Sequence, residues 1–272
     1  FATALGWEIY ERTHSAFALG LVGLIQVLAM FACTLPAGHF ADVYNRKHIV
    51  ALMTFVIAVA NVGLTVISAA TAPVWLIYLC LAVTGTARSF LWAASASFMP
   101  QLVERKDFPQ AVTWSSTSFQ ISSIVGPAAG GTLLHFTHHA AVIYALNAAA
   151  ATVFGVMVTR IRLHHVPVEA ERMTLKTLLT GFDFVFHNRV ILGIISLDMF
   201  AVLLGGATAL MPIYAKDILH VGPYGLGLLQ AALPIGAIFC SFTLAHRPPM
   251  RKAGRSLLLA VVIFGLGTIA FG

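Results

Sequence analysis

Two ionisable residues, Asp198 and Arg88, lie inside long apolar segments of this 272-residue chain. If these segments are helices, Asp198 lies about eight residues, or ~12 Å, into its segment, and Arg88 about twelve residues, or ~18 Å, from a basic loop. A charge inside a membrane costs about 2.5–3.5 kcal/mol on insertion scales, so such residues are candidates for function. A carboxyl group at such a site can exchange protons near neutral pH. We therefore predict that Asp198 couples protons or binds a cation and that Arg88 pairs with it or holds an anionic substrate; a static ion pair is the alternative.

Charged residues also follow the apolar segment Phe17–Phe40. Asp42 lies four residues after Gly38, and the basic residues Arg46 and Lys47 come next. We expect the carboxylate and the two cations to form a charged cluster at a membrane surface, where the small Gly38 allows a neighbouring helix end to approach. A solvated turn whose cations only anchor the chain is the alternative.

Another segment contains the run Gly126-Pro127-Ala128-Ala129-Gly130-Gly131. Proline removes a backbone donor, and glycines allow the backbones of two membrane helices to touch. Gly126, Pro127, Gly130 and Gly131 therefore form either a hinge or tight seal, or the small-residue packing that is common in membrane helices.

Uncharged polar residues also lie within apolar segments, namely Gln26, Asn61, Gln120 and Asn147. Each is expected either to line a cavity or to hydrogen-bond to a neighbouring helix, the second role being the commoner one. Glu8 and Glu11, which lie near the end of an apolar segment, are instead expected at the membrane interface.

Few other patterns suggest chemistry. His135, His138 and His139 have nearly the spacing of metal ligands, but no cysteine or acidic residue near them completes a site. The sequence has no phosphate-binding loop and no arrangement typical of a serine hydrolase or a zinc protease. We therefore predict no metal, no cofactor and no enzymatic activity, with an ion gradient rather than ATP as the energy source.

The composition identifies the elements that carry these residues. Hydrophobic residues make up 59% of the chain and charged residues only 10%, and the mean hydropathy is +0.88. A soluble domain has about 25% charged residues, and a disordered chain has low hydrophobicity, so both classes are excluded. Segments such as Phe17–Ala37 are apolar on every face, as membrane-spanning helices are, and lack the alternation of barrel strands. The sequence predicts an all-α, polytopic membrane protein.

Apolar stretches and charged breaks delimit the predicted spans. They are the end of a first helix up to Tyr10, then Phe17–Phe40, Ile49–Ser68, Pro73–Pro100, Ala111–Phe136, Ala140–Thr159, Val190–Ala215, Tyr224–Ala245 and Ser256–Gly272. Because the first and last look incomplete, we expect a piece of a longer chain that is cut within a helix at both ends.

Basic residues fall mainly on one side of the predicted spans. Of the 16 Lys and Arg residues, all but Arg12, Lys216 and Arg88 lie in alternate loops or in the polar stretch 161–189 and its flanks. Cationic loops stay in the cytoplasm, so we place these segments on the cytoplasmic face of the cell inner membrane. The net charge of +6 therefore reflects topology and attraction to anionic lipid, and no nucleic-acid binding is expected.

The chain also has a two-part organisation. Residues 161–189 form the one long polar stretch, and residues 18–22 resemble residues 225–229. Two halves of equal orientation joined by a cytoplasmic linker are the layout of a secondary transporter. We therefore divide the chain into an N-terminal half (1–160), a linker (161–189) that ends in a surface helix, Leu175–Phe186, and the start of a C-terminal half (190–272).

Several motifs resemble those of a known family. The loop from Gly38 to Lys47, with Asp42 and Arg46, is similar to the signature loop of the major facilitator superfamily, and Gly126–Gly131 resembles its exporter motif. Further similarity to the enterobactin-exporter-like branch, whose members export siderophores or drugs, lies in Pro100–Val103, Leu197–Asp198, Ala209–Pro212 and Gly225–Ala232. The chain departs from the usual motifs at Val43, Ser122 and Leu91-Trp92, where arginine, glycine and Gln-Gly are common.

The resemblance implies a fold of two six-helix halves, the second incomplete here, whose first, fourth, seventh and tenth helices line a central cavity. Arg88 and Asp198 would then face that cavity. Asp42 would hold the outward-open state until protonation or substrate binding releases it, and the exporter motif would favour export over import. The implied function is proton-coupled export of a small amphipathic molecule, siderophore-like or drug-like, by a monomer that alternates access between the two faces.

Two other functions are compatible with the sequence. A related transporter would carry another cargo, such as a lysophospholipid or a sugar, and would ignore a collapsed pH gradient or move its cargo inward. A polytopic membrane protein without transport activity would move no cargo in vesicles, and changes at Asp42 or Asp198 would then have no effect.

Overall fold

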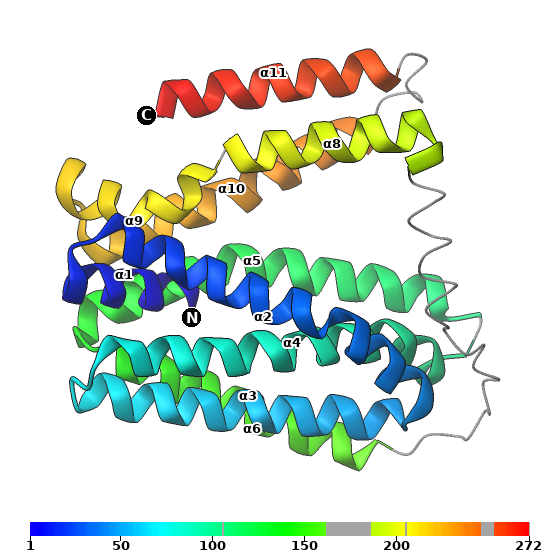
Figure 1. Cartoon of the computed structure of the whole chain (residues 1–272), viewed down its shortest axis with the longest axis horizontal. Coiled ribbons are helices and arrows are strands. Elements are labelled where there is room, and N and C mark those ends of the chain that lie inside the picture. Colours follow the sequence, from blue (N-terminus) through cyan, green and yellow to red (C-terminus); the bar gives the residue numbers. More distant parts are fainter. Residues whose placement is uncertain (105, 162–185, 205, 246–252, 272) are drawn as a thin grey trace.

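The computed structural model describes residues 1–104, 106–161, 186–204, 206–245 and 253–271, and these ranges contain helices and no strand (Figure 1). The first six helices are α1 (Ala2–Thr13), α2 (Ala16–Val43), α3 (Arg46–Ala69), α4 (Val74–Leu102), α5 (Phe108–Thr137) and α6 (Ala140–Arg160). After the linker come α8 (Arg189–Leu204), a broken segment (206–218), α10 (Gly222–Ala245) and α11 (Ala253–Phe271). The predicted all-α class is confirmed.

Five of the described helices are long and apolar enough to cross a membrane, namely α2, α3, α4, α6 and α10. The α2–α3 and α4–α5 connections and the end of α6 lie at the same end of the molecule, on the right of Figure 1. They carry Arg46, Lys47, Lys106 and Arg160, so this is the cytoplasmic end by the positive-inside rule, and we call the opposite end the outer end. The chain is a multi-pass membrane protein.

Local sequence signals explain where three of the helices begin. The Ser15 side chain accepts a hydrogen bond from the Ala18 N–H at the start of α2, and Asn45 accepts one from the Lys47 N–H at the start of α3. Such residues satisfy backbone donors that have no partner within the helix. Pro109 lies in the first turn of α5, where its missing N–H removes no helical hydrogen bond.

The prediction of one continuous helix over Val190–Ala215 is wrong. α8 ends at Leu204, and the chain continues as a 3₁₀ turn (Gly206–Leu210), a single α-helical turn (α9, Met211–Ile213) and a π-helical turn (Tyr214–Ile218). Gly206 and Pro212 explain the interruption, because glycine has a low helix propensity and proline cannot donate a backbone hydrogen bond. Apart from Phe186, the predicted surface helix of the linker lies outside the described residues.

Buried side chains concentrate in the first six helices. The larger core cluster includes Leu5 of α1, Leu64 of α3, Leu81 of α4 and Tyr144 of α6, each at most 2% exposed. In contrast, none of the side chains described on α8 or α11 is buried. The N-terminal group of helices therefore forms a packed unit, against which the later helices are anchored chiefly through α9 and α10.

One polar contact lies inside this packed unit. The Asn147 side chain of α6 donates a hydrogen bond of 2.9 Å to Oδ1 of Asn61 on α3, and Asn61 is 1% exposed. Asn61 also donates to the Ile57 carbonyl oxygen. Of the two roles expected for these asparagines, the structure shows the hydrogen bond between helices.

We expect Asn147→Leu to lower the free energy of unfolding by about 1 kcal/mol, because it leaves the Asn61 carbonyl oxygen buried without its donor. The double variant Asn61→Leu/Asn147→Leu should be more stable than this single variant, because it removes both polar groups together. Unfolding in mixed micelles with increasing denaturing detergent measures both. A double variant as unstable as the sum of the two single variants would contradict this explanation.

Candidate transport pathway and gates

The N-terminal helices meet the later helices at the outer end, where α5 crosses α10 with their backbones in contact. A Cβ atom on Gly131 would lie 2.6 Å from the Pro223 carbonyl oxygen and 2.8 Å from the Gly227 Cα. A Cβ atom on Gly227 would lie 2.6 Å from the Pro127 carbonyl oxygen. Because side-chain carbons do not approach backbone atoms this closely, the crossing requires glycine at both positions.

The predicted glycine and proline run contributes unequally to this crossing. Pro127 and Gly131 contact α10, and a Cβ atom on the buried Gly130 would lie 3.8 Å from Thr3 of α1. Gly126, by contrast, has no atom of another segment within 4 Å of the position that its Cβ would occupy. The close contact with α10 therefore involves only the side of α5 that carries Pro127 and Gly131.

Polar and aromatic side chains add a second connection at the outer end. The Tyr10 hydroxyl of α1 donates a hydrogen bond to the Asp217 carboxylate in the π-helical turn. The Lys216 ammonium lies 5.6 Å from the ring centroid of Trp7 and 5.8 Å from that of Tyr10, within the range of cation–π attraction. We call these four residues, Trp7, Tyr10, Lys216 and Asp217, the outer clamp.

A buried charge cluster fixes α1 to the N-terminal helices. Glu8 is 6% exposed, accepts a 2.7 Å hydrogen bond from the Tyr144 hydroxyl and lies 2.6 Å from Nη2 of Arg12. Arg12 also donates to the carbonyl oxygens of Ser68, in the last turn of α3, and of Ala72, in the loop that follows. The sequence predicted only that Glu8 lies at the membrane interface, not that it is buried in a charge cluster. The Glu8–Arg12 spacing of four residues is nevertheless typical of a helical ion pair. Glu11 is exposed.

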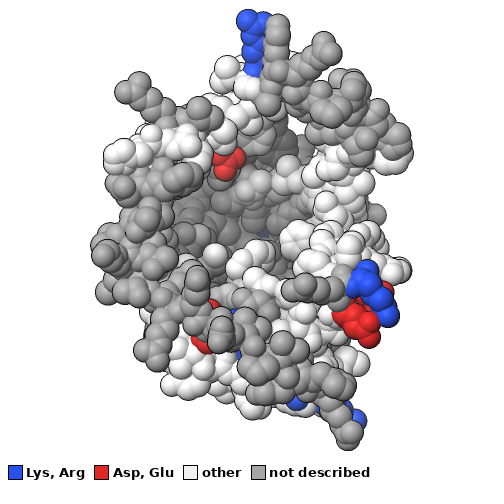
Figure 2. Space-filling model, turned by 90° about the vertical axis from the view of Figure 1, so that its right-hand side faces the viewer, with Lys and Arg blue, Asp and Glu red and all other residues white. Residues whose placement is uncertain are grey.

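Toward the cytoplasmic end, none of the described α10 residues is buried. On α10, residues 225–227 and Ala231 are buried, whereas every described residue from Ala232 to Thr243 is exposed or half-buried. Figure 2 looks onto this end of the molecule and shows a hollow in its centre. The close contacts between α10 and the N-terminal helices therefore lie near the outer end.

Asp42, in the last turn of α2, and the cations Arg46 and Lys47 at the start of α3 lie at the cytoplasmic end, and neither cation pairs with Asp42. Nε of Arg46 donates to the Ala41 carbonyl oxygen at 3.2 Å, and Nζ of Lys47 donates to the Ile161 carbonyl oxygen at 2.7 Å. Cations interact favourably with the carbonyl groups at helix C-termini. Asp42 is half-buried and has no hydrogen bond or ion pair with a described residue. Gly38 has open space around its Cα.

Arg88 and Asp198, the two predicted intramembrane charges, are both exposed. The guanidinium carbon of Arg88 lies 5.9 Å from the ring centroid of Phe1. In the described part of the chain, no ion pair joins Arg88 to Asp198 or to another carboxylate.

The histidines at the outer end do not converge on one point. The His135 ring centroid lies 6.3 Å from that of His138 and 6.4 Å from that of Tyr224 on α10. No group of three potential metal ligands occurs among the residues that the structure describes. The arrangement consists of ring contacts near the α5–α10 crossing.

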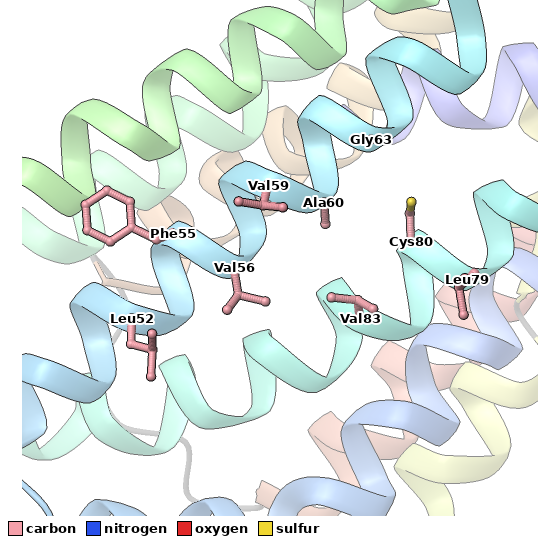
Figure 3. A pocket seen from close by; sticks show the side chains of 9 residues that line it. All are labelled: Leu52, Phe55, Val56, Val59, Ala60, Gly63, Leu79, Cys80 and Val83. Atoms are coloured by element: carbon pink, nitrogen blue, oxygen red, sulfur yellow. The ribbon is translucent and has the colours of Figure 1, made fainter. Parts of the chain in front are cut away.

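A groove of about 550 Å³ lies between α3 and α4 (Figure 3). Its lining residues are Leu52, Phe55, Val56, Val59, Ala60, Gly63, Leu79, Cys80 and Val83. The Cys80 thiol is the only polar group among these side chains, and Val59 is 71% exposed. The groove suits hydrocarbon and offers almost no hydrogen bond to a polar ligand.

The family model of the Major Facilitator Superfamily matches residues 1–272. The chain belongs to this superfamily. Among curated proteins, the enterobactin exporters EntS of Citrobacter koseri and of Escherichia coli O1:K1 / APEC are each 29% identical to it over 267 residues. The aligned region covers 95% of this chain and 64% of each relative, so the chain spans just under two thirds of their length. The predicted resemblance to this superfamily and to enterobactin exporters is confirmed.

We expect Gly131→Ala to lower the stability of this superfamily member by about 1–3 kcal/mol, because its Cβ must push α5 and α10 apart. Gly126→Ala is the matched control in the same motif and should change the melting temperature little, since the site is open. Thermal unfolding of the purified variants in detergent compares them. Equal melting temperatures for the two variants would show that the backbone contact is not required.

We expect Tyr10→Phe to shift the protein toward an outer-open state by about three- to tenfold, because it removes one hydrogen bond of about 0.5–1.5 kcal/mol from the outer clamp. Spin labels on Glu11→Cys and Ile218→Cys, both at exposed positions, report the distance across the clamp. Tyr78→Phe is the control, because Tyr78 donates to the Ala18 carbonyl oxygen within the N-terminal helices. An unchanged distance distribution in Tyr10→Phe would exclude a role of this hydrogen bond in closure.

Proposed function

We propose that this chain belongs to a secondary active transporter that exports a small amphipathic molecule from the cytoplasm in exchange for protons. The observation that carries the proposal is the asymmetry between the two ends, with glycine contacts and the outer clamp at the outer end and a hollow at the cytoplasmic end. A transporter that alternates access exposes its site to one face at a time. This conformation corresponds to the state that loads cargo from the cytoplasm.

The proposed architecture is an N-terminal half (1–160), a cytoplasmic linker (161–189) and the beginning of a C-terminal half (190–272) of a monomer in the inner membrane. Reorientation would break the outer clamp and close the cytoplasmic end. Asp42, half-buried and without a partner among the described residues, would then pair with the C-terminal half. We expect the glycine crossing to remain closed longest, as a hinge between the halves.

Asp198 is the proposed proton site, and Arg88 the proposed partner of this carboxylate or of an anionic group on the cargo. Both are exposed in the open state, and both lie within predicted spans, where an unpaired charge is stable only beside water or a partner. Protonation of Asp198 at the outer face and its release at the inner face would couple the gradient to export. The similarity to enterobactin exporters supports a siderophore such as enterobactin as the cargo.

The test is enterobactin transport by the purified full-length protein in proteoliposomes with an imposed pH gradient. We expect gradient-driven accumulation in the wild type and its loss in Asp198→Asn, which should still exchange enterobactin between equal concentrations because exchange needs no net proton movement. Asp107→Asn, at an exposed carboxylate at the start of α5, is the control and should transport normally.

Other results would exclude parts of the proposal. Gradient-driven export that persists in Asp198→Asn would end the coupling assignment. Transport that ignores a collapsed gradient would favour a uniporter or another coupling ion. Transport of a lysophospholipid or a sugar, but not of enterobactin, would show that the cargo assignment is wrong. No transport of any of them would favour a protein without transport activity.

A further inference from the structure

α5 is unusually polar for a helix of 30 residues in a membrane protein, and it is not among the five helices that are apolar enough to span a bilayer. Its cytoplasmic half contains a dense run of uncharged polar side chains, namely Thr113, Ser115, Ser116, Thr117, Ser118, Gln120, Ser122 and Ser123. The helix contains no Asp, Glu, Lys or Arg. Hydroxyl and amide groups without partners are costly against lipid, so such a run implies a polar environment on at least one side.

Helical geometry places part of this run on the side of α5 that meets α10. At 3.6 residues per turn, Thr113, Ser116, Gln120 and Ser123 follow one stripe, and the same stripe continues through Pro127 to Gly131. Gly131 is the residue whose backbone touches α10. We call Thr113, Ser116, Gln120 and Ser123 the α5 polar face; by helical geometry it lies on the side of α5 that carries the contact with α10.

Burial along this stripe decreases steadily toward the cytoplasm. Gly131 is buried, Ser123 and Gln120 are half-buried, and Ser116 and Thr113 are exposed. The same decrease occurs on α10, which is buried only near its outer end. The two helices therefore separate below their glycine crossing, and the hollow that Figure 2 shows at the cytoplasmic end fits such a separation.

The hydrogen-bonding groups of the α5 polar face are largely unused. Thr113 donates to the Pro109 carbonyl oxygen and Ser123 to the Gln120 carbonyl oxygen, which leaves their hydroxyl oxygens free to accept. No hydrogen bond joins the Ser116 hydroxyl or the Gln120 amide to another described residue. Near the outer end of the stripe, the Thr3 hydroxyl of α1 donates a hydrogen bond to Oε1 of Gln230 on α10. This contact between the two groups of helices is also polar and uncharged.

We propose that the α5 polar face binds the transported molecule in the cytoplasm-open state through neutral hydrogen bonds, and thereby selects cargo that carries hydroxyl and amide groups. This inference rests on the proposed function and adds a cargo-binding surface to it. It assigns recognition of the uncharged part of the cargo to α5, whereas Arg88 and Asp198 are assigned to charge and proton coupling. The apolar groove between α3 and α4 cannot supply such contacts.

The first test is accessibility in the full-length protein with its native cysteines replaced. Ser116→Cys and Gln120→Cys should react with a membrane-impermeant maleimide from the cytoplasmic side, and saturating enterobactin should protect both. Ser118→Cys is the matched control, because Ser118 is also exposed but lies on the opposite side of α5, so enterobactin should not protect it. Labelling at Ser118→Cys but not at Ser116→Cys would overturn the proposal.

The second test is enterobactin affinity measured without a gradient. Ser116→Ala and Gln120→Ala should each weaken binding about three- to tenfold, the effect of one neutral hydrogen bond, and Ser118→Ala should leave it unchanged. A hydroxylated benzamide should compete better than its methyl ether in the wild type, and Gln120→Ala should reduce that preference. Melting temperatures establish that each variant is folded.

The outcomes separate the two proposals. Enterobactin transport without protection at Ser116→Cys and Gln120→Cys, and with unchanged affinity in the alanine variants, overturns the cargo-binding role of α5 alone. Protection and weakened binding without proton-driven transport support that role and overturn the coupled export. A full-length protein that neither binds nor moves enterobactin overturns both.

Discussion

The contact between Gly131 of α5 and Gly227 of α10 is the constraint on which the rest of the arrangement depends. It brings two backbones together at the outer end, where hydrophobic exclusion from water does not drive helix association and close packing must supply the attraction. Away from this crossing, toward the cytoplasmic end, the two helices lie apart in Figure 1. The outer clamp lies at the same end as this crossing, whereas the exposed part of the α5 polar face lies toward the cytoplasmic end.

The polar side chains within the membrane helices differ in whether they have partners. Glu8, Arg12 and Tyr144 satisfy one another within the N-terminal helices, as do Asn61 and Asn147, so these groups hold the unit together. Asp42, Asp198 and Arg88 have no such charged partner among the described residues. Groups that are already satisfied stabilise one conformation, whereas groups without partners can change partners when the conformation changes.

The polar contacts of α1 fall into two sets. One side of this short helix is bound to the N-terminal helices through Glu8 and Arg12, and the other contacts the later helices through Tyr10 and Thr3. The first set of contacts is buried and charged, and the second is small and includes the exposed Asp217. In an alternating cycle, α1 would therefore stay with the N-terminal unit while the weaker contacts open.

The amino-acid sequence by itself determined the membrane class, the positions of most helices, the cytoplasmic end and the family, because apolar length, basic loops and motif spacing are local properties of the chain. It also indicated that Gly126–Gly131 permits close packing. The break in the segment after Leu204, the burial of Glu8 and the choice of Gly131 rather than Gly126 as the contact needed the tertiary structure. So did the binding of Arg46 and Lys47 to carbonyl oxygens instead of Asp42. Each of these depends on which distant helix lies opposite a given face, and spacing along one helix cannot specify that partner.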